Sequence, residues 1–173
     1  MATARADARG TAGSATPTVE ASDLGLVAQG YAARGWRVFP CHSIRNGACT
    51  CGDWECRREG KHPRLAHGVK EATKDPETIE GWWTLWPRAN IAIACGEASG
   101  LVVIDIDPEH GGELSLQALE AAHGALPETG IVRTGGGGRH FYFVHPGAPI
   151  GNKVGLAQGI DMELPRFSGQ CST

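Results

Sequence analysis

The spacing of apolar residues along the chain predicts three helices. Apolar side chains recur at helical intervals over 22–35, 75–87 and 114–126. The second of these has the strongest start signal, because Asp75 can accept a hydrogen bond at the N-cap and Pro76 suits the first helical position. The tryptophans of this helix are interpreted as core rather than as a base-stacking platform.

Apolar and alternating segments predict the strands of the fold. These segments are 36–40, 90–96, 101–107, 131–135, 139–146 and 159–164. Short turns with glycine join 90–96 to 101–107 and 131–135 to 139–146, so we expect adjacent antiparallel hairpins. Together with the helices, these strands predict an α+β fold with a mixed, largely antiparallel sheet, flanking helices and a small insert.

Composition restricts the partners and the cellular location that we expect for the protein. The 173 residues carry a formal net charge of -3, so any nucleic-acid-binding surface must be local. No segment is apolar enough to cross a membrane, and residues 1–20, poor in large apolar side chains, read as a disordered leader without a secretion signal. We therefore expect a cytoplasmic protein, in which six cysteines favour metal binding over disulfides.

Two aspartates end the apolar strand 101–107. Because alternate residues of a strand share a face, Asp105 and Asp107 project side by side while Ile104 and Ile106 face the core. Two carboxylates this close repel each other unless a cation lies between them. The pattern therefore indicates a site for Mg²⁺ or Mn²⁺.

Two alternatives for the aspartates remain open. In the first, Asp107 and Pro108 merely start a turn and Asp105 is solvated at the strand end. The second is a calcium-binding loop, which fits poorly because His110 stands where an EF-hand needs glycine.

A run of four glycines, 135–138, precedes Arg139 and His140. A P-loop would need Lys followed by Ser or Thr and then a helix, whereas this run leads into an aromatic strand. The backbone amides of a glycine turn can still cradle phosphate. With Asp161 on a later strand, these residues form a set that suits metal-dependent nucleotidyl transfer.

Six collinear stretches resemble the bifunctional primase/polymerase domain of the archaeo-eukaryotic primase superfamily. The matching stretches are 31–40, 60–64, 71–83, 90–107, 134–143 and 159–161. The resemblance implies that Asp105, Asp107 and Asp161 bind the catalytic metal and that His140 contacts nucleotide phosphate. The residues that we expect to bind nucleotide are Gly136, Gly137, Gly138, Arg139, His140 and Lys61.

The resemblance also sets the domain boundaries. It implies a catalytic domain over 21–164 and leaves 165–173 as an irregular tail. The family usually has serine within the glycine run and continues past the third acid, so we expect the end of the catalytic sheet to be missing here. That expectation leaves open whether the domain is active.

Residues 41–67 form a cysteine-rich insert without periodicity. Cys49, Cys51, Cys56 and His62 offer four ligands suited to a structural zinc ion, with Cys41 and His42 as spare candidates. A reduced loop without metal is the alternative. Residues 41–70 carry six Lys or Arg against three acids, so the insert can contact template or primer phosphates, or it can be a solvated loop.

The resemblance implies a DNA primase/polymerase that transfers nucleotides from nucleoside triphosphates in the replication of a plasmid, phage or integrated element. Its expected partners are single-stranded DNA template, primer and a separately encoded replicative helicase. One alternative is a catalytically inactive nucleic-acid-binding accessory module. Another is a metal-dependent hydrolase of nucleotides or phosphodiesters that uses the same acids.

Overall fold

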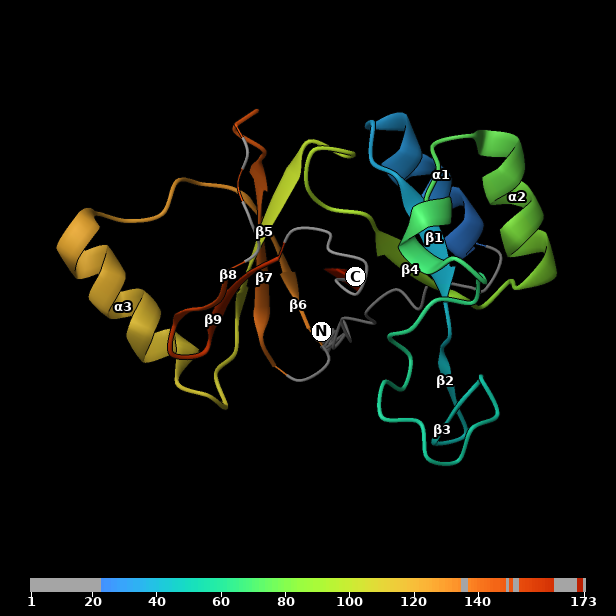
Figure 1. Cartoon of the computed structure of the whole chain (residues 1–173), viewed down its shortest axis with the longest axis horizontal. Coiled ribbons are helices and arrows are strands. Elements are labelled where there is room, and N and C mark those ends of the chain that lie inside the picture. Colours follow the sequence, from blue (N-terminus) through green and yellow to red (C-terminus); the bar gives the residue numbers. More distant parts are fainter. Residues whose placement is uncertain (1–22, 135–136, 149, 151–152, 164–170, 173) are drawn as a thin grey trace, which may run out of the picture.

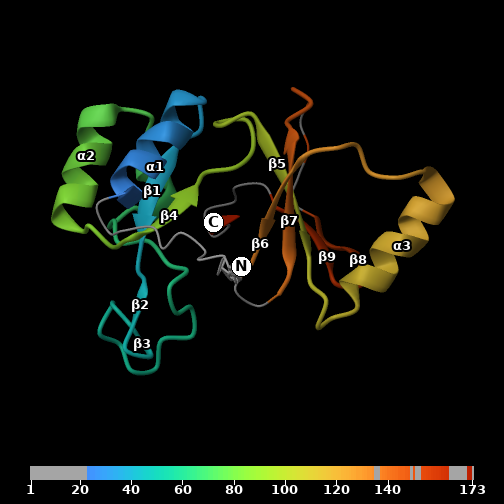
Figure 2. The same ribbon diagram turned by 180° about the vertical axis from the view of Figure 1, so that it is seen from behind.

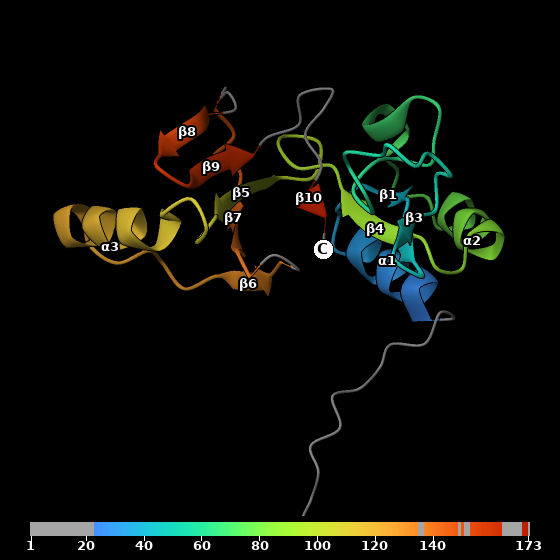
Figure 3. The same cartoon turned by 90° about the horizontal axis from the view of Figure 1, so that it is seen from below.

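The computed structural model describes residues 23–134, 137–148, 150, 153–163 and 171–172. The strands of these residues form two larger groups that stand side by side (Figure 1, Figure 3) and a separate two-stranded hairpin in the cysteine-rich insert. The helices are α1 Asp23–Ala33, α2 Pro76–Leu85 and α3 Gly112–His123, with a 3-10 helix η1 at Gly68–Glu71. The strands are β1 Val38–Cys41, β2 Ile44–Arg45, β3 Ala48–Cys49, β4 Asn90–Ile93, β5 Leu101–Ile106, β6 Gly130–Arg133, β7 Arg139–Val144, β8 Lys153–Ala157, β9 Ile160–Glu163 and β10 Cys171–Ser172. The predicted leader and most of the predicted tail lie outside these residues.

The first group is a three-stranded antiparallel sheet, in the order β1-β4-β10, packed against α1 and α2 (Figure 2). Helix α2 starts as predicted, with Pro76 at its first position and the Asp75 carboxylate accepting a hydrogen bond from Thr78 N at 2.8 Å. Ile79 and Trp83 of α2 are buried against this sheet, which confirms that the helix serves the core.

The second group is a five-stranded antiparallel sheet in the order β6-β7-β5-β9-β8. Ile106, Phe141 and Ile160 pack with Leu116 of α3 on one face of this sheet. Leu114, near the start of the same helix, is 73% exposed and does not contribute to this core. The N-terminal part of helix α3 contacts the sheet, and the rest of the helix projects away from it (Figure 1).

The α+β class is confirmed, but the predicted hairpin of β4 and β5 is wrong. A single bridge between Gly96 and Leu101 is the only ladder contact there in the described chain, and the two strands belong to different sheets. Both edges of β4 are paired with β1 and β10, and both edges of β5 with β7 and β9. The apolar alternation of two successive strands could not reveal that neither has a free edge for the other.

Within the described residues, no helix is long and apolar enough to span a membrane.

Candidate active site

Three of the predicted site residues lie in one row across the second sheet. Asp105, on the central strand β5, is directly opposite His140 on β7 and directly opposite Asp161 on β9. Directly opposed residues of antiparallel strands point to the same face. The structure therefore brings together Asp105, His140 and Asp161 from three separate segments of the chain.

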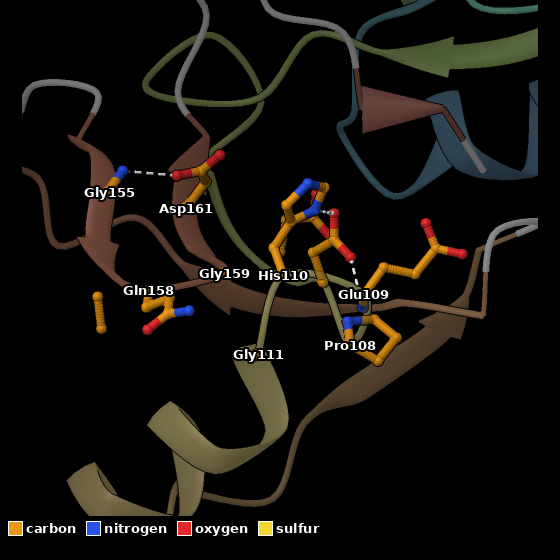
Figure 4. A pocket seen from close by; sticks show the side chains of 11 residues that line it. Pro108, Glu109, His110, Gly111, Gly155, Gln158, Gly159 and Asp161 are labelled. Carbon is orange, nitrogen blue, oxygen red and sulfur yellow. Dashed lines mark hydrogen bonds and ion pairs between the residues drawn. The ribbon is translucent and has the colours of Figure 1, made fainter.

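Asp107 follows β5 and is held by both its backbone and its side chain. Its backbone N donates to Gly159 O at 2.8 Å, and its backbone O accepts from Gly112 N at 2.8 Å. Its carboxylate accepts from Glu109 N at 2.9 Å, and its second oxygen lies 2.7 Å from His110 Nδ1 (Figure 4). The direction of this carboxylate is thus fixed by its own loop.

Two glycines allow this close approach of backbone segments. A Cβ on Gly112 would lie 2.3 Å from Gly159 O and 2.7 Å from Asp107 O. A Cβ on Gly159 would lie 2.5 Å from Gly112 N, and the φ of Gly159 is +67°. Any larger residue at either position would push the loop of Asp107 away from β9, which carries Asp161.

A pocket of about 900 Å³ opens beside the carboxylates. The loop 108–111 forms one wall, and the end of β8 with the turn to β9, at 157–159, forms another (Figure 4). Asp161 faces this pocket and accepts a hydrogen bond from Gly155 N at 2.6 Å. The pocket is within the usual size range of small-molecule sites and is large enough for a nucleotide.

The carboxylates form an acidic site that favours a cation. Burial raises the pKa of Asp105, and the charges of Asp107 and Asp161 raise it further, while His140 and Lys61 act in the opposite direction. A divalent cation between the acids would remove this repulsion. The all-oxygen donor set suits Mg²⁺ or Mn²⁺.

His140 is buried beside the acids, with 7% of its surface exposed. Its Nε2 lies 3.4 Å from an oxygen of Asp105, and its buried Nδ1 has no hydrogen-bond partner among the described residues. Burial lowers the pKa of His140, Asp105 raises it, and the charge of Lys61 lowers it again. The ring is therefore held largely neutral, and its Nδ1 is enclosed by protein.

Not all of the other residues that were predicted to bind nucleotide lie at the acidic site. Arg139 is on the opposite face of β7 from His140, and its guanidinium pairs with Glu113 of α3 at 2.5 Å. Gly136 lies outside the described residues. Gly137 N donates to Thr134 O at 3.0 Å, while Gly138 is packed so closely that a Cβ would lie 2.8 Å from Ile106 O.

The cysteine-rich insert forms a compact cluster of possible metal ligands. The ligand atoms of Cys49, Cys51, Cys56 and His62 all lie within 4.8 Å of one another. His62 Nε2 is 3.4 Å from the sulfur of Cys49 and 3.5 Å from that of Cys56. Separations of this size fit four ligands arranged around one tetrahedral zinc ion.

A tight hairpin brings the first cysteine into this cluster. Asn46 and Gly47 join β2 to β3 with φ values of +50° and +78°, which is typical of a type I′ turn. Burial raises the pKa of Cys49, but hydrogen bonds from Gly60, Cys51 and His62 outweigh it and lower the pKa to about 6. A thiol that ionises this readily favours metal binding.

The two spare candidates are outside the cluster. Cys41 is buried in β1, which raises the pKa of its thiol to about 12. His42 stacks on His62 with ring centroids 4.4 Å apart, and its Nδ1 bonds Thr50 Oγ1 at 3.1 Å. His42 therefore supports the ring of a ligand and does not join the four ligands.

Sequence reasoning missed His110 as a site residue. It was considered only as a mismatch to a calcium-binding loop, yet it contacts Asp107 and lines the pocket. The signal was available, because the two residues are three positions apart in a turn. The side chain of Gln158, on the opposite wall, was missed because β8 was not predicted.

An antiparallel sheet that gathers three carboxylates and a histidine beside an open pocket is typical of a metal-dependent enzyme acting on phosphate groups. The family model of the bifunctional DNA primase/polymerase, N-terminal domain, matches residues 28–169. The chain therefore belongs to this family, which implies a role as a primase or polymerase in replication. No curated protein matches the chain significantly.

Proposed function

We propose that this chain catalyses template-directed nucleotidyl transfer from nucleoside triphosphates, as the DNA primase/polymerase of a plasmid, phage or integrated element. The observation that carries the proposal is the row His140, Asp105 and Asp161, with Asp107 beside it. This row combines groups able to bind a divalent cation with a neutral imidazole able to bind phosphate. Each of these groups comes from a different strand or strand end of one sheet.

In this proposal the three aspartates hold Mg²⁺ or Mn²⁺. When bound, such ions neutralise charge on the triphosphate and lower the pKa of the attacking 3′-hydroxyl. In this proposal His140 and Lys61 orient the triphosphate, because an imidazole N–H and an ammonium group can both donate hydrogen bonds to phosphate oxygens. The pocket beside Asp161, on the side of the acids that faces β8, accommodates the reacting groups of the substrates.

The insert binds a structural zinc ion and contacts the single-stranded template. The residues between Cys51 and Cys56 form the tip of the insert. They include Trp54, whose side chain is 88% exposed. An exposed tryptophan on a rigid support can stack on an unpaired base, and the nearby arginines can pair with phosphates. The zinc ion would hold this tip in one conformation.

The test is incorporation of labelled nucleotide on a single-stranded template, with and without a primer, in Mg²⁺ and in Mn²⁺. The double variant Asp105→Ala, Asp107→Ala is the inactive comparison, and Glu80→Gln on the exposed side of α2 is the matched control. Template-dependent product that disappears only in the double variant supports the proposal. A folded protein that binds DNA without making product supports the accessory module, and turnover that ignores the template supports the hydrolase.

A further inference from the structure

Asp107 has a different kind of support from the other two aspartates of the acidic site. Asp105 and Asp161 stand on strands of the sheet, whereas β5 ends at Ile106 and Asp107 is the first residue of the loop that follows it. The side chain of Asp107 is 45% exposed, compared with 31% for Asp105. An exposed carboxylate on a loop turns freely unless hydrogen bonds restrict it.

Hydrogen bonds from the loop 108–111 hold both oxygens of Asp107. One oxygen accepts from the backbone N of Glu109 at 2.9 Å, and the other lies 2.7 Å from Nδ1 of His110 (Figure 4). An ionised carboxylate can only accept, so Nδ1 of His110 carries the proton and donates it. Each oxygen keeps a second lone pair, and these remaining lone pairs are available to a cation.

The loop places His110 beside Asp107 through its own backbone bonds. Gly111 N donates to Pro108 O at 3.2 Å. Gly112 N donates to Asp107 O at 2.8 Å, which closes the turn around the histidine. The side chain of His110 is 75% exposed, so packing does not hold its ring in place. The bond to Asp107 is therefore what this side chain contributes to the site.

We propose that His110 is a positioning residue, which holds the carboxylate of Asp107 in the direction that the catalytic cation requires. The inference rests on the proposed function. A carboxylate already restricted by two hydrogen bonds loses little rotational freedom when Mg²⁺ or Mn²⁺ binds, so the ion binds more tightly. Removing a hydrogen-bond partner of a metal-binding carboxylate commonly lowers metal affinity or activity by about ten- to a hundredfold. His110 thus acts on the ion through Asp107 and is not a ligand itself.

The experiment measures the dissociation constant of Mn²⁺ from the electron paramagnetic resonance signal of the free ion. The protein is loaded with zinc beforehand, so that the cysteine cluster does not take up Mn²⁺. We expect His110→Ala to weaken Mn²⁺ binding roughly tenfold. Because Nδ2 of asparagine is bonded to Cγ, as Nδ1 of histidine is, His110→Asn should recover most of the affinity. His110→Gln, whose amide lies one bond farther from the backbone, should not.

Controls separate this effect from damage to the fold. Because the side chain of His110 is exposed, the melting temperature of His110→Ala in metal-free buffer should stay within about two degrees of the natural value. His123→Ala, in the exposed last turn of α3, should leave the Mn²⁺ affinity unchanged. The double variant Asp105→Ala, Asp107→Ala gives the baseline for Mn²⁺ bound elsewhere on the protein.

The outcomes distinguish the inference from the proposed function. Equal or tighter Mn²⁺ binding in His110→Ala would overturn the inference, and tighter binding would show that the histidine competes with the ion for Asp107. Failure of asparagine to recover the affinity would also overturn it, because the bond from Nδ1 would then not be the cause. A natural chain that binds no Mn²⁺ would overturn both this inference and the proposed metal site. Mn²⁺ binding that depends on His110, without any template-directed product, would support the inference and refute the proposed function alone.

Discussion

Asp105 on β5 and Asp161 on β9 are directly opposed residues of two neighbouring antiparallel strands. Like charges in this position destabilise a sheet, and here Asp107 adds a third negative charge. The sheet therefore carries a repulsion that its apolar face, around Ile106 and Ile160, must offset. Such a cost at one point of an otherwise regular sheet is expected where function requires the charges.

The first prediction concerns Asp161→Asn, which keeps the oxygen that accepts from Gly155 N. Because one of three repelling charges is removed, we expect the melting temperature in metal-free buffer to stay equal or rise. The rise caused by Mn²⁺ should be lost, and nucleotide incorporation should fall roughly a hundredfold or more. Thermal melts with and without Mn²⁺, beside an incorporation assay, measure both effects. Glu80→Gln should behave like the natural chain, and full activity of Asp161→Asn would contradict the proposed metal site.

The second prediction concerns the glycines that hold the loop of Asp107. Gly112→Ala places a methyl group 2.3 Å from Gly159 O, so we expect it to destabilise the fold by roughly 3 kcal/mol and to weaken Mn²⁺ binding. Gly30→Ala in α1 is the matched control, since nothing lies within 4 Å of its added Cβ. That change should stabilise by about 1 kcal/mol. Denaturant melts compare the free energy of unfolding of the two variants. Equal changes would show that the close approach at Gly112 does not affect stability.

The local signals of the sequence were sufficient for most single elements. The N-cap at Asp75, the alternation around Asp105 and the aromatic strand after the glycine run each predicted an element that the structure contains. The relation of Asp105 to Asp161 is different, because the spacing along each strand does not define the register between strands. The sequence grouped these two residues by their chemistry alone, and the resemblance to a known family assigned both of them to the catalytic metal.

The missed features have identifiable physical reasons. The turn Asn46-Gly47 is a strong hairpin signal, but the strands beside it have only two residues each and show no alternation. Strand β8 contains Gly155 in the left-handed region and a register shift against β9, so its pattern does not resemble a strand. The separation of β4 from β5 depends on which distant strands occupy their edges.

The third prediction tests zinc in the insert. We expect the purified chain to hold one zinc ion and to lose it in the double variant Cys51→Ser, Cys56→Ser. Without the metal, trypsin should cut after Arg57 at least severalfold faster, because the loop between the cysteines is then unsupported. Cutting after the exposed Arg88 provides the internal control, since it lies outside the insert. Cys95→Ala should keep its zinc, and metal-independent cutting at Arg57 would argue for a loop without metal.

The fourth prediction concerns the cap of α2. Hydrogen bonds from the hydroxyl and the backbone N of Thr78 lower the pKa of Asp75. A lowered pKa stabilises the fold above the unfolded-state pKa of about 3.9, and that stabilisation is lost as the pH falls through the lower folded-state value. Asp75→Ala should therefore lower the melting temperature by a few degrees at pH 7 and by less at pH 3. Asp75→Ser, which can still cap the helix, should recover most of the loss, and a difference independent of pH would contradict the role of the charge.

The last prediction concerns Trp54 and the template. Trp54 sits in a turn closed by two bonds to Asp53, from Glu55 N at 2.9 Å and from Cys56 N at 3.3 Å. This turn presents the indole ring to solvent. Because stacking of one base on an aromatic ring contributes about 1–3 kcal/mol, Trp54→Ala should weaken binding of single-stranded DNA roughly tenfold. Trp54→Phe should retain part of the affinity, and neither change should alter zinc content or nucleotide affinity. Fluorescence anisotropy of a labelled oligonucleotide measures the effect, and unchanged affinity in Trp54→Ala would remove the tip of the insert from the template path.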